Sequence, residues 1–96
     1  MNPVYVSAVV EAKPGHGEDL ERALAGVVAE VRREQGCIKY DLHRQDERFL
    51  FYEIWETQAD LDAHGQASHM QALRESIAEI VAGPPLVETW SAVDVA

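Results

Sequence analysis

Hydrophobic residues recur along most of the chain with the period of a strand or of a helix, and these periods predict its elements. In residues 4–11 the apolar side chains fall on alternate positions, which is typical of a β-strand. Between residues 18 and 33 they recur every three or four positions, which predicts one long helix. Gly36 follows, at the place where a left-handed residue ends many helices. The chain therefore begins with a strand and a helix.

Two strand-like runs, residues 37–44 and residues 48–56, come next and are joined by a short polar turn, which predicts an antiparallel hairpin. The second run is mostly apolar on both of its faces. Its apolar residues are Phe49, Phe51 and Trp55 on one face, and Leu50, Tyr52 and Ile54 on the other. In an antiparallel sheet with one solvent-exposed face, the strands instead alternate apolar and polar residues. We therefore expect helices to cover one face of this sheet and a different surface to cover the other.

The C-terminal part of the chain carries signals for two helices and a strand. Thr57 is placed to cap a short helix, which Gly65 interrupts. Ser68, with a glutamine three residues later, matches a capping box and predicts a second helix that runs to the breaker at residues 83–85. A last strand is expected over residues 86–95. The helix pair thus connects the hairpin to the final strand.

The resulting order is β-α-β-β-α-β, which predicts the α+β class and a ferredoxin-like split βαβ fold with a four-stranded antiparallel sheet. Residues 1–96 are expected to form a single domain. Helices would cover one face of the sheet, and the open face would be apolar. Two such sheets packed face to face would cover each other, so we predict a homodimer through sheet-to-sheet packing.

Composition narrows the classes of partner. The 96 residues include 8 Lys and Arg against 17 Asp and Glu, a net charge of −9, which argues against binding to nucleic acid or to an anionic membrane. The single cysteine, Cys37, forms no internal disulfide, and no C-x-x-C sequence indicates a metal site. A signal peptide and a long apolar run are both missing, so a cytoplasmic location is expected.

Candidate chemistry centres on two histidines and a carboxylate. His64 and His69 flank the predicted helix break, and on one continuous helix their spacing would place them about 140° apart, so they converge only if the chain bends. Each can also be a structural histidine. Glu53 lies between Phe51 and Trp55 on one strand face and needs a partner if buried; it is either an ion-paired structural residue or a ligand-orienting group.

Aromatic side chains offer a pocket for a small molecule, although the same residues can simply form the core. They are Tyr40, Phe49, Phe51, Tyr52, Trp55 and Trp90. The glycine-rich dinucleotide and phosphate loops and the nucleophile elbow are absent from the sequence. A small, neutral or weakly acidic aromatic molecule is therefore the expected partner.

Four stretches of the chain, taken together, resemble the antibiotic biosynthesis monooxygenase domain family. They are Lys13-Pro14-Gly15, Glu34-Gln35-Gly36-Cys37, Phe51-Tyr52-Glu53-Ile54-Trp55-Glu56 and Ala63-His64-Gly65-Gln66-Ala67-Ser68-His69-Met70. The resemblance covers nearly the whole chain. It is closest to small stand-alone quinol monooxygenases and extends to autoinducer-2 degrading proteins of similar length.

This resemblance implies a dimeric α+β barrel that oxidises phenols or quinols with molecular oxygen as co-substrate and without a metal, flavin or haem. It implies that Trp55 lines or polarises the pocket, that His64 or His69 takes the substrate proton, and that Glu53 orients its neighbours. The residues expected to bind substrate are Glu53, Phe51, Tyr40 and Met70. Haem-degrading relatives carry an asparagine on the first strand, where this chain reads Val6-Ser7-Ala8.

Two other functions stay open from the sequence. One is isomerisation or breakdown of a small phosphorylated signal molecule of the autoinducer-2 type, for which the basic candidates are Lys39, Arg44, Arg48 and Arg74. The other is a dimeric binding domain without catalysis, since one fold hosts many functions. The position of these side chains relative to any cavity distinguishes the three alternatives.

Overall fold

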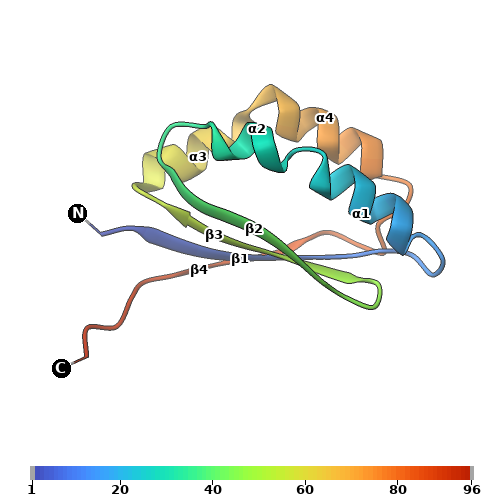
Figure 1. Ribbon diagram of the computed structural model, residues 1–96, viewed down its shortest axis with the longest axis horizontal. Helices are drawn as coiled ribbons and strands as arrows, with labels where there is room; N and C mark the ends of the chain where they lie inside the picture. The colour runs from blue at the N-terminus through green and yellow to red at the C-terminus, as the bar shows by residue number, and fades with distance from the viewer. Residues whose placement is uncertain (1, 96) are drawn as a thin grey trace.

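The computed structural model of the protein describes residues 2–95, which form four strands and four helices (Figure 1). In chain order these are β1 (Val4–Glu11), α1 (Gly17–Ala25), α2 (Val28–Arg32), β2 (Cys37–Gln45), β3 (Arg48–Trp55), α3 (Gln58–Gln66), α4 (Ser68–Ile77) and β4 (Leu86–Trp90). None of the helices within residues 2–95 is long and apolar enough to cross a membrane.

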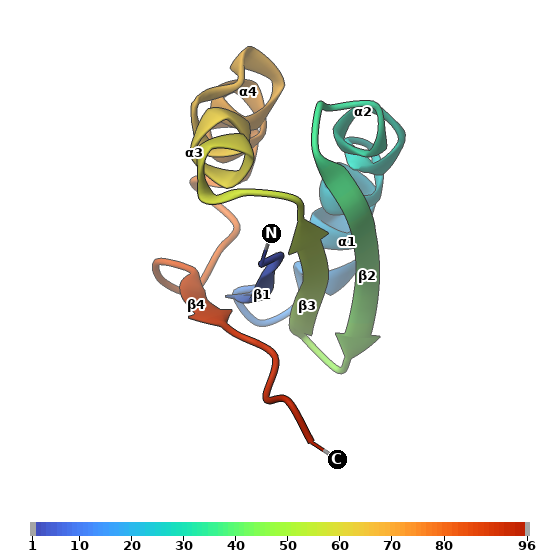
Figure 2. The ribbon, with the colours of Figure 1, turned by 90° about the vertical axis from the view of Figure 1, so that its left-hand side faces the viewer.

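The four strands form one antiparallel sheet in the order β2-β3-β1-β4. All helices lie on the same side of this sheet, so the molecule has two layers (Figure 1). Figure 2 shows α1 and α2 over the half formed by β2 and β3, and α3 and α4 over the half formed by β1 and β4. The predicted α+β, ferredoxin-like fold with its four-stranded antiparallel sheet is confirmed.

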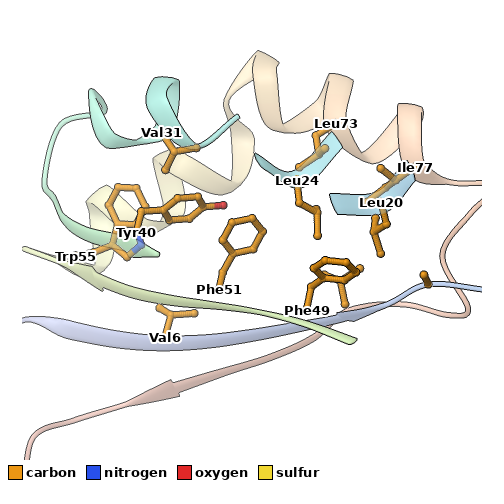
Figure 3. Close-up of a cluster of buried hydrophobic side chains, with 12 residues drawn as sticks. Val6, Leu20, Leu24, Val31, Tyr40, Phe49, Phe51, Trp55, Leu73 and Ile77 are labelled. Carbon is orange, nitrogen blue, oxygen red and sulfur yellow. The ribbon is translucent and has the colours of Figure 1, made fainter. Parts of the chain in front are cut away.

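The core lies between the sheet and the helices, where apolar side chains from both layers meet (Figure 3). The strands contribute their alternate residues and the helices contribute residues three or four positions apart, as the sequence periods require. The labelled core residues are Val6, Tyr40, Phe49, Phe51 and Trp55 from the strands and Leu20, Leu24, Val31, Leu73 and Ile77 from the helices. Each of them is at least nine-tenths buried.

The other face of the sheet has no covering layer within residues 2–95 (Figure 2). The strand register places Tyr5 of β1 opposite Ile54 of β3 on one side and Trp90 of β4 on the other, so apolar residues gather on this face. Tyr52 is 36% exposed and Trp90 is 54% exposed. The prediction that β3 is apolar on both faces, with helices on only one of them, is confirmed.

The predicted long helix is wrong, because it divides into α1 and α2 at Gly26 and Val27. Glycine is a poor helix former, and β-branched valines follow it, so the local preference for a continuous helix is weak here. Gly36 does adopt the left-handed conformation, with φ of 81°. It lies in the turn before β2 rather than directly at the end of α2, and a Cβ there would collide with Asp60.

Thr57 caps α3 as predicted, since its hydroxyl accepts a hydrogen bond from the Asp60 N–H at 3.1 Å. The predicted capping box at Ser68 is wrong. Gly65 is accommodated inside α3, so the helix continues to Gln66 and Ala67 becomes the N-cap of α4 without a side-chain bond. Ser68 is then the first residue of α4, where its hydroxyl no longer occupies the capping position.

The last two elements are shorter than predicted. α4 ends at Ile77 instead of at the breaker of residues 83–85, and Val81 beyond it forms an isolated bridge with Ala12. β4 ends at Trp90, although the sequence predicts a strand to residue 95. Trp90 pairs with Tyr5, which is only one residue from the start of β1, so the backbone beyond Trp90 has no neighbouring strand to bond.

Candidate active site

A cavity of about 230 Å³ lies between the helix-covered face of the sheet and the helices α3 and α4. Its walls come from all four strands and from α1, α3 and α4, and they are mostly apolar. The polar residues in the walls are Tyr40, Glu53, His64 and Arg74. A mostly apolar cavity with a few convergent polar groups is the usual form of a small-molecule site.

The structure places most of the sequence-predicted site residues at this cavity. The residues that line it are Tyr40, Phe51, Glu53, His64 and Met70. Trp55 and Phe49 are instead buried in the core beside it, and Tyr52 and Trp90 lie on the exposed sheet. His69 does not line the cavity either, so the two histidines occupy different positions relative to a bound molecule.

His64 is the basic side chain of the cavity wall, and it is 6% exposed. Its Nδ1 lies 3.0 Å from Oε2 of Glu34 and therefore donates a hydrogen bond to this carboxylate. In a neutral imidazole this contact places the proton on Nδ1 and leaves a lone pair on Nε2. Within residues 2–95 the hydrogen bonds of His64 involve Nδ1 and none involves Nε2, so the lone pair on Nε2 is not engaged by another side chain. In this tautomer the His64 ring can accept a proton on Nε2.

Glu34 joins the two histidines, and the sequence analysis did not include it among the site residues. Its Oε2 lies 3.0 Å from Nδ1 of His64 and 2.6 Å from Nε2 of His69. The chain bend at Ala67 between α3 and α4 brings both rings to this one carboxylate. The one local signal for Glu34 was its place just after the end of a helix, where the helix dipole disfavours a carboxylate.

Trp55 and Glu53 form a second buried pair on β3. The indole Nε1 of Trp55 donates a hydrogen bond to Oε1 of Glu53 at 2.9 Å. The Trp55 ring also lies 4.7 Å from the His64 ring, centroid to centroid, so Trp55 supports both polar residues from behind the cavity wall. Burial raises the pKa of the Glu53 carboxyl, the Trp55 hydrogen bond and His64 oppose this, and Glu34 adds to it. The Glu53 carboxyl therefore holds its proton to a higher pH than an exposed glutamate does, and in its protonated form it can donate a hydrogen bond to a ligand oxygen.

Tyr40 is a further polar residue of the cavity wall and lies next to His64. Its ring lies beside that of Phe51 (Figure 3), on which it stacks with centroids 4.6 Å apart. It also meets the His64 ring edge-on at 5.5 Å. Burial raises the pKa of the Tyr40 hydroxyl, and the carboxylates of Glu53 and Glu34 act in the same direction. The hydroxyl therefore remains protonated and offers a hydrogen-bond donor at the cavity.

We expect Glu53→Gln to become progressively more stable than the wild type as the pH rises from about 4 to 7. Because the pKa of Glu53 in the folded protein is raised above the ordinary value of a glutamate, the unfolded chain loses this proton first, and the stability of the folded state falls as pH rises through the folded-state pKa. Glutamine does not titrate, yet it still accepts the Trp55 hydrogen bond. Urea unfolding at both pH values measures the difference. With Glu75→Gln on the exposed side of α4 as control, a pH-independent difference would contradict the expectation.

The basic residues do not form an anion site at the cavity. Of the four candidates only Arg74 lines it, and Arg74 donates a hydrogen bond to the carbonyl of Gly65 at 2.9 Å. Lys39 pairs with Asp41, and Arg44 pairs with glutamates of α1. Within residues 2–95 no group of three or more His, Cys, Asp or Glu side chains is arranged to hold a metal ion.

Fold and site together define a small ferredoxin-like α+β protein with an apolar cavity and a histidine–carboxylate pair at its wall. Residues 3–76 match the family model described as antibiotic biosynthesis monooxygenase. The match covers most of the chain, and the protein therefore belongs to the antibiotic biosynthesis monooxygenase family.

Solved structures and a curated relative are similar to this chain over nearly its whole length. PA3566 from Pseudomonas aeruginosa superimposes with a TM-score of 0.91 at 29% identity, over 98% of this chain and 97% of the other. Rv0793 from Mycobacterium tuberculosis gives 0.88 at 26% identity, over 98% of both chains. The uncharacterized protein sll1783 from Synechocystis sp. (strain ATCC 27184 / PCC 6803 / Kazusa) is 27% identical over 92 residues, and this chain spans 63% of its length.

Proposed function

We propose that this protein is a cofactor-independent monooxygenase that oxidises a small phenolic or hydroquinone substrate with O₂. The observation that carries the proposal is His64 at the wall of an apolar cavity, with its Nδ1 bonded to Glu34 and its Nε2 free of a hydrogen bond within residues 2–95. This arrangement supplies a base in a site from which apolar walls exclude water. The family described as antibiotic biosynthesis monooxygenase provides the reaction class.

In the proposed reaction, Nε2 of His64 takes the proton of a phenolic hydroxyl. The phenolate is electron-rich and passes electrons to O₂ without a cofactor. One oxygen atom enters the ring and the other leaves as water, so a hydroquinone gives a hydroxyquinone and the substrate supplies all four electrons. Tyr40 and Glu53 line the same cavity and would donate hydrogen bonds to the second oxygen of the ring. The other residues expected to contact the ring are Phe51 and Met70.

The test is oxygen uptake with a panel of monocyclic and bicyclic hydroquinones, compared with the protein-free oxidation of each compound in air. We expect the protein to raise the rate for at least one of them, with one atom from ¹⁸O₂ in the product and no turnover under nitrogen. A rate equal to the protein-free background for the whole panel would reject the proposal. Turnover of a phosphorylated sugar-like signal under nitrogen would favour the isomerase alternative, and saturable binding without turnover would favour a binding domain.

We also propose that two copies of the chain pair through the uncovered face of the sheet. The support is the apolar side chains on this face, where Tyr52 of β3 and Leu86 and Trp90 of β4 are exposed and Tyr5 and Val9 of β1 are half-buried between them. Large exposed apolar side chains that gather on one face often mark a protein–protein interface. A symmetric dimer would cover both sheets and enlarge the core of a chain of 96 residues.

A further inference from the structure

Four titratable side chains lie in a row from the cavity wall to the protein surface. Nδ1 of His64 is 3.0 Å from Oε2 of Glu34, this same oxygen is 2.6 Å from Nε2 of His69, and Nδ1 of His69 is 3.3 Å from Oε2 of Glu30. The side-chain exposures are 8% for His64, 14% for Glu34, 17% for His69 and 55% for Glu30. The row is therefore mostly enclosed and reaches solvent only at its outer end.

The two histidines differ in what faces their ring nitrogens. Both nitrogens of His69 face a carboxylate oxygen, and a carboxylate only accepts hydrogen bonds. Nε2 is hydrogen-bonded to Glu34, and Nδ1 lies within ion-pair distance of Glu30. A neutral imidazole would point a lone pair toward one of the two carboxylates, whereas an imidazolium places a protonated nitrogen beside each of them. His64 faces a carboxylate on one nitrogen only, and the remaining side of its ring faces Tyr40, Trp55 and the cavity.

Glu34 needs a positive partner because it is largely buried. An enclosed carboxylate without a compensating charge loses several kcal/mol of solvation and tends to take up a proton. Glu34 lies close enough to Glu53 to contribute to the raised pKa of the Glu53 carboxyl. A neutral Glu34 would bind His64 more weakly. Its carboxyl proton could also be donated to Nδ1, and the ring would then carry its own proton on Nε2 instead. The state of Glu34 therefore depends on His69.

We propose that Glu34 and His69 are positioning residues for His64: His69, as an imidazolium between Glu30 and Glu34, keeps Glu34 ionised, and Glu34 holds His64 in the tautomer with a proton-accepting Nε2. This inference rests on the proposed function for its catalytic meaning. It changes the role of His69, which the family resemblance had made a candidate base. In this inference His69 supplies a positive charge next to Glu34, outside the cavity, and His64 is the general base.

The test is ¹⁵N NMR of the imidazole nitrogens at neutral pH without substrate, since the ¹⁵N signals distinguish protonated from unprotonated ring nitrogens. In the wild type we expect both nitrogens of His69 to carry protons, and His64 to carry a proton on Nδ1 only. Glu34→Ala should abolish the preference of His64 for the Nδ1-protonated form. A neutral His69 in the wild type, or a His64 tautomer that does not respond to Glu34→Ala, would overturn the inference.

Variants of His69 separate its charge from its volume. His69→Gln keeps a donor toward Glu34 but removes the positive charge, so we expect turnover to fall about 10-fold or more, in the range typical of groups that orient a functional histidine. His69→Arg retains the charge and should recover part of the loss. His43→Gln, on the exposed part of β2, is the matched control and should leave the His64 signals unchanged. Equal turnover in His69→Gln and the wild type would contradict the role of the charge.

These measurements keep the two proposals apart. The NMR pattern needs no substrate, so the expected tautomers in a protein without oxygenase activity would reject the function and retain the network. Oxygenase activity in a protein whose His64 is protonated on Nε2 would retain the function and reject the network. The wild-type spectrum alone decides the charge of His69, even if a variant fails to fold.

Discussion

Replacing His64 by glutamine is expected to lower hydroquinone oxidation by about 10²–10⁴-fold, the usual contribution of a positioned general base. Glutamine has a similar volume, and its amide can still bond to Glu34, so the wall of the cavity stays filled. It cannot accept the phenolic proton at the position of Nε2. Since His64 is 6% exposed and packs against Trp55, the conservative exchange is preferable to alanine. Steady-state kinetics should show the loss in kcat, with a smaller change in KM.

The matched control for this variant is His43→Gln, which changes a histidine of β2 outside the cavity. Its activity should equal that of the wild type. A His64→Gln protein with wild-type kcat would show that His64 is not the base. The Glu53 carboxyl would then be the next candidate. At alkaline pH, where phenols ionise without a base, the activity that His64→Gln loses relative to the wild type should be smaller than at neutral pH. This rescue distinguishes the loss of a base from a damaged cavity.

Tyr52→Lys is expected to convert the proposed dimer into a monomer, with a dissociation constant at least about 10³-fold higher. Tyr52 lies in the middle of β3 on the uncovered face, and a symmetric interface buries each substituted residue twice. Burying an ammonium group costs several kcal/mol per ion, and every 1.4 kcal/mol corresponds to a factor of ten. In the monomer the lysine remains in water opposite Asp41, so the fold should persist.

Analytical ultracentrifugation over nanomolar to micromolar concentrations measures this effect. Gln71→Lys, on the exposed side of α4, carries the same charge change away from the sheet and should leave the dimer intact. A wild-type protein that sediments as a monomer at all micromolar concentrations would contradict the dimer. A Tyr52→Lys protein that remains dimeric would place the interface on another surface.

The hairpin of β2 and β3 shows how much of the fold the sequence carries locally. Alternation at a period of two is a property of the strand itself, so the two apolar faces of β3 and its neighbours in the sheet were predictable. The ends of the elements were less predictable, because they depend on which other segments of the chain offer backbone hydrogen bonds. β4 ends at Trp90, whose partner Tyr5 is one residue from the start of β1, so this limit is set by a segment more than 80 residues earlier in the chain.

The candidate site shows the same division. His64, Glu53 and Tyr40 were identified from residue type and position, and the structure places them around one cavity. Glu34 was missed because its partners are 30 and 35 residues away in sequence, so no local spacing relates them. His69 was identified as a candidate base, yet the bend at Ala67 directs it to Glu34 and away from the cavity.

By itself the sequence determined the element types, the side of each strand that is buried and the presence of an uncovered apolar face, because these follow from side-chain periodicity and the hydrophobic effect. Only the tertiary structure decided which histidine meets the cavity and which carboxylate orients it. Hydrogen bonds act over about 3 Å and depend on angle, so a bend of one residue between two helices changes the role of a side chain without changing the pattern that predicted it.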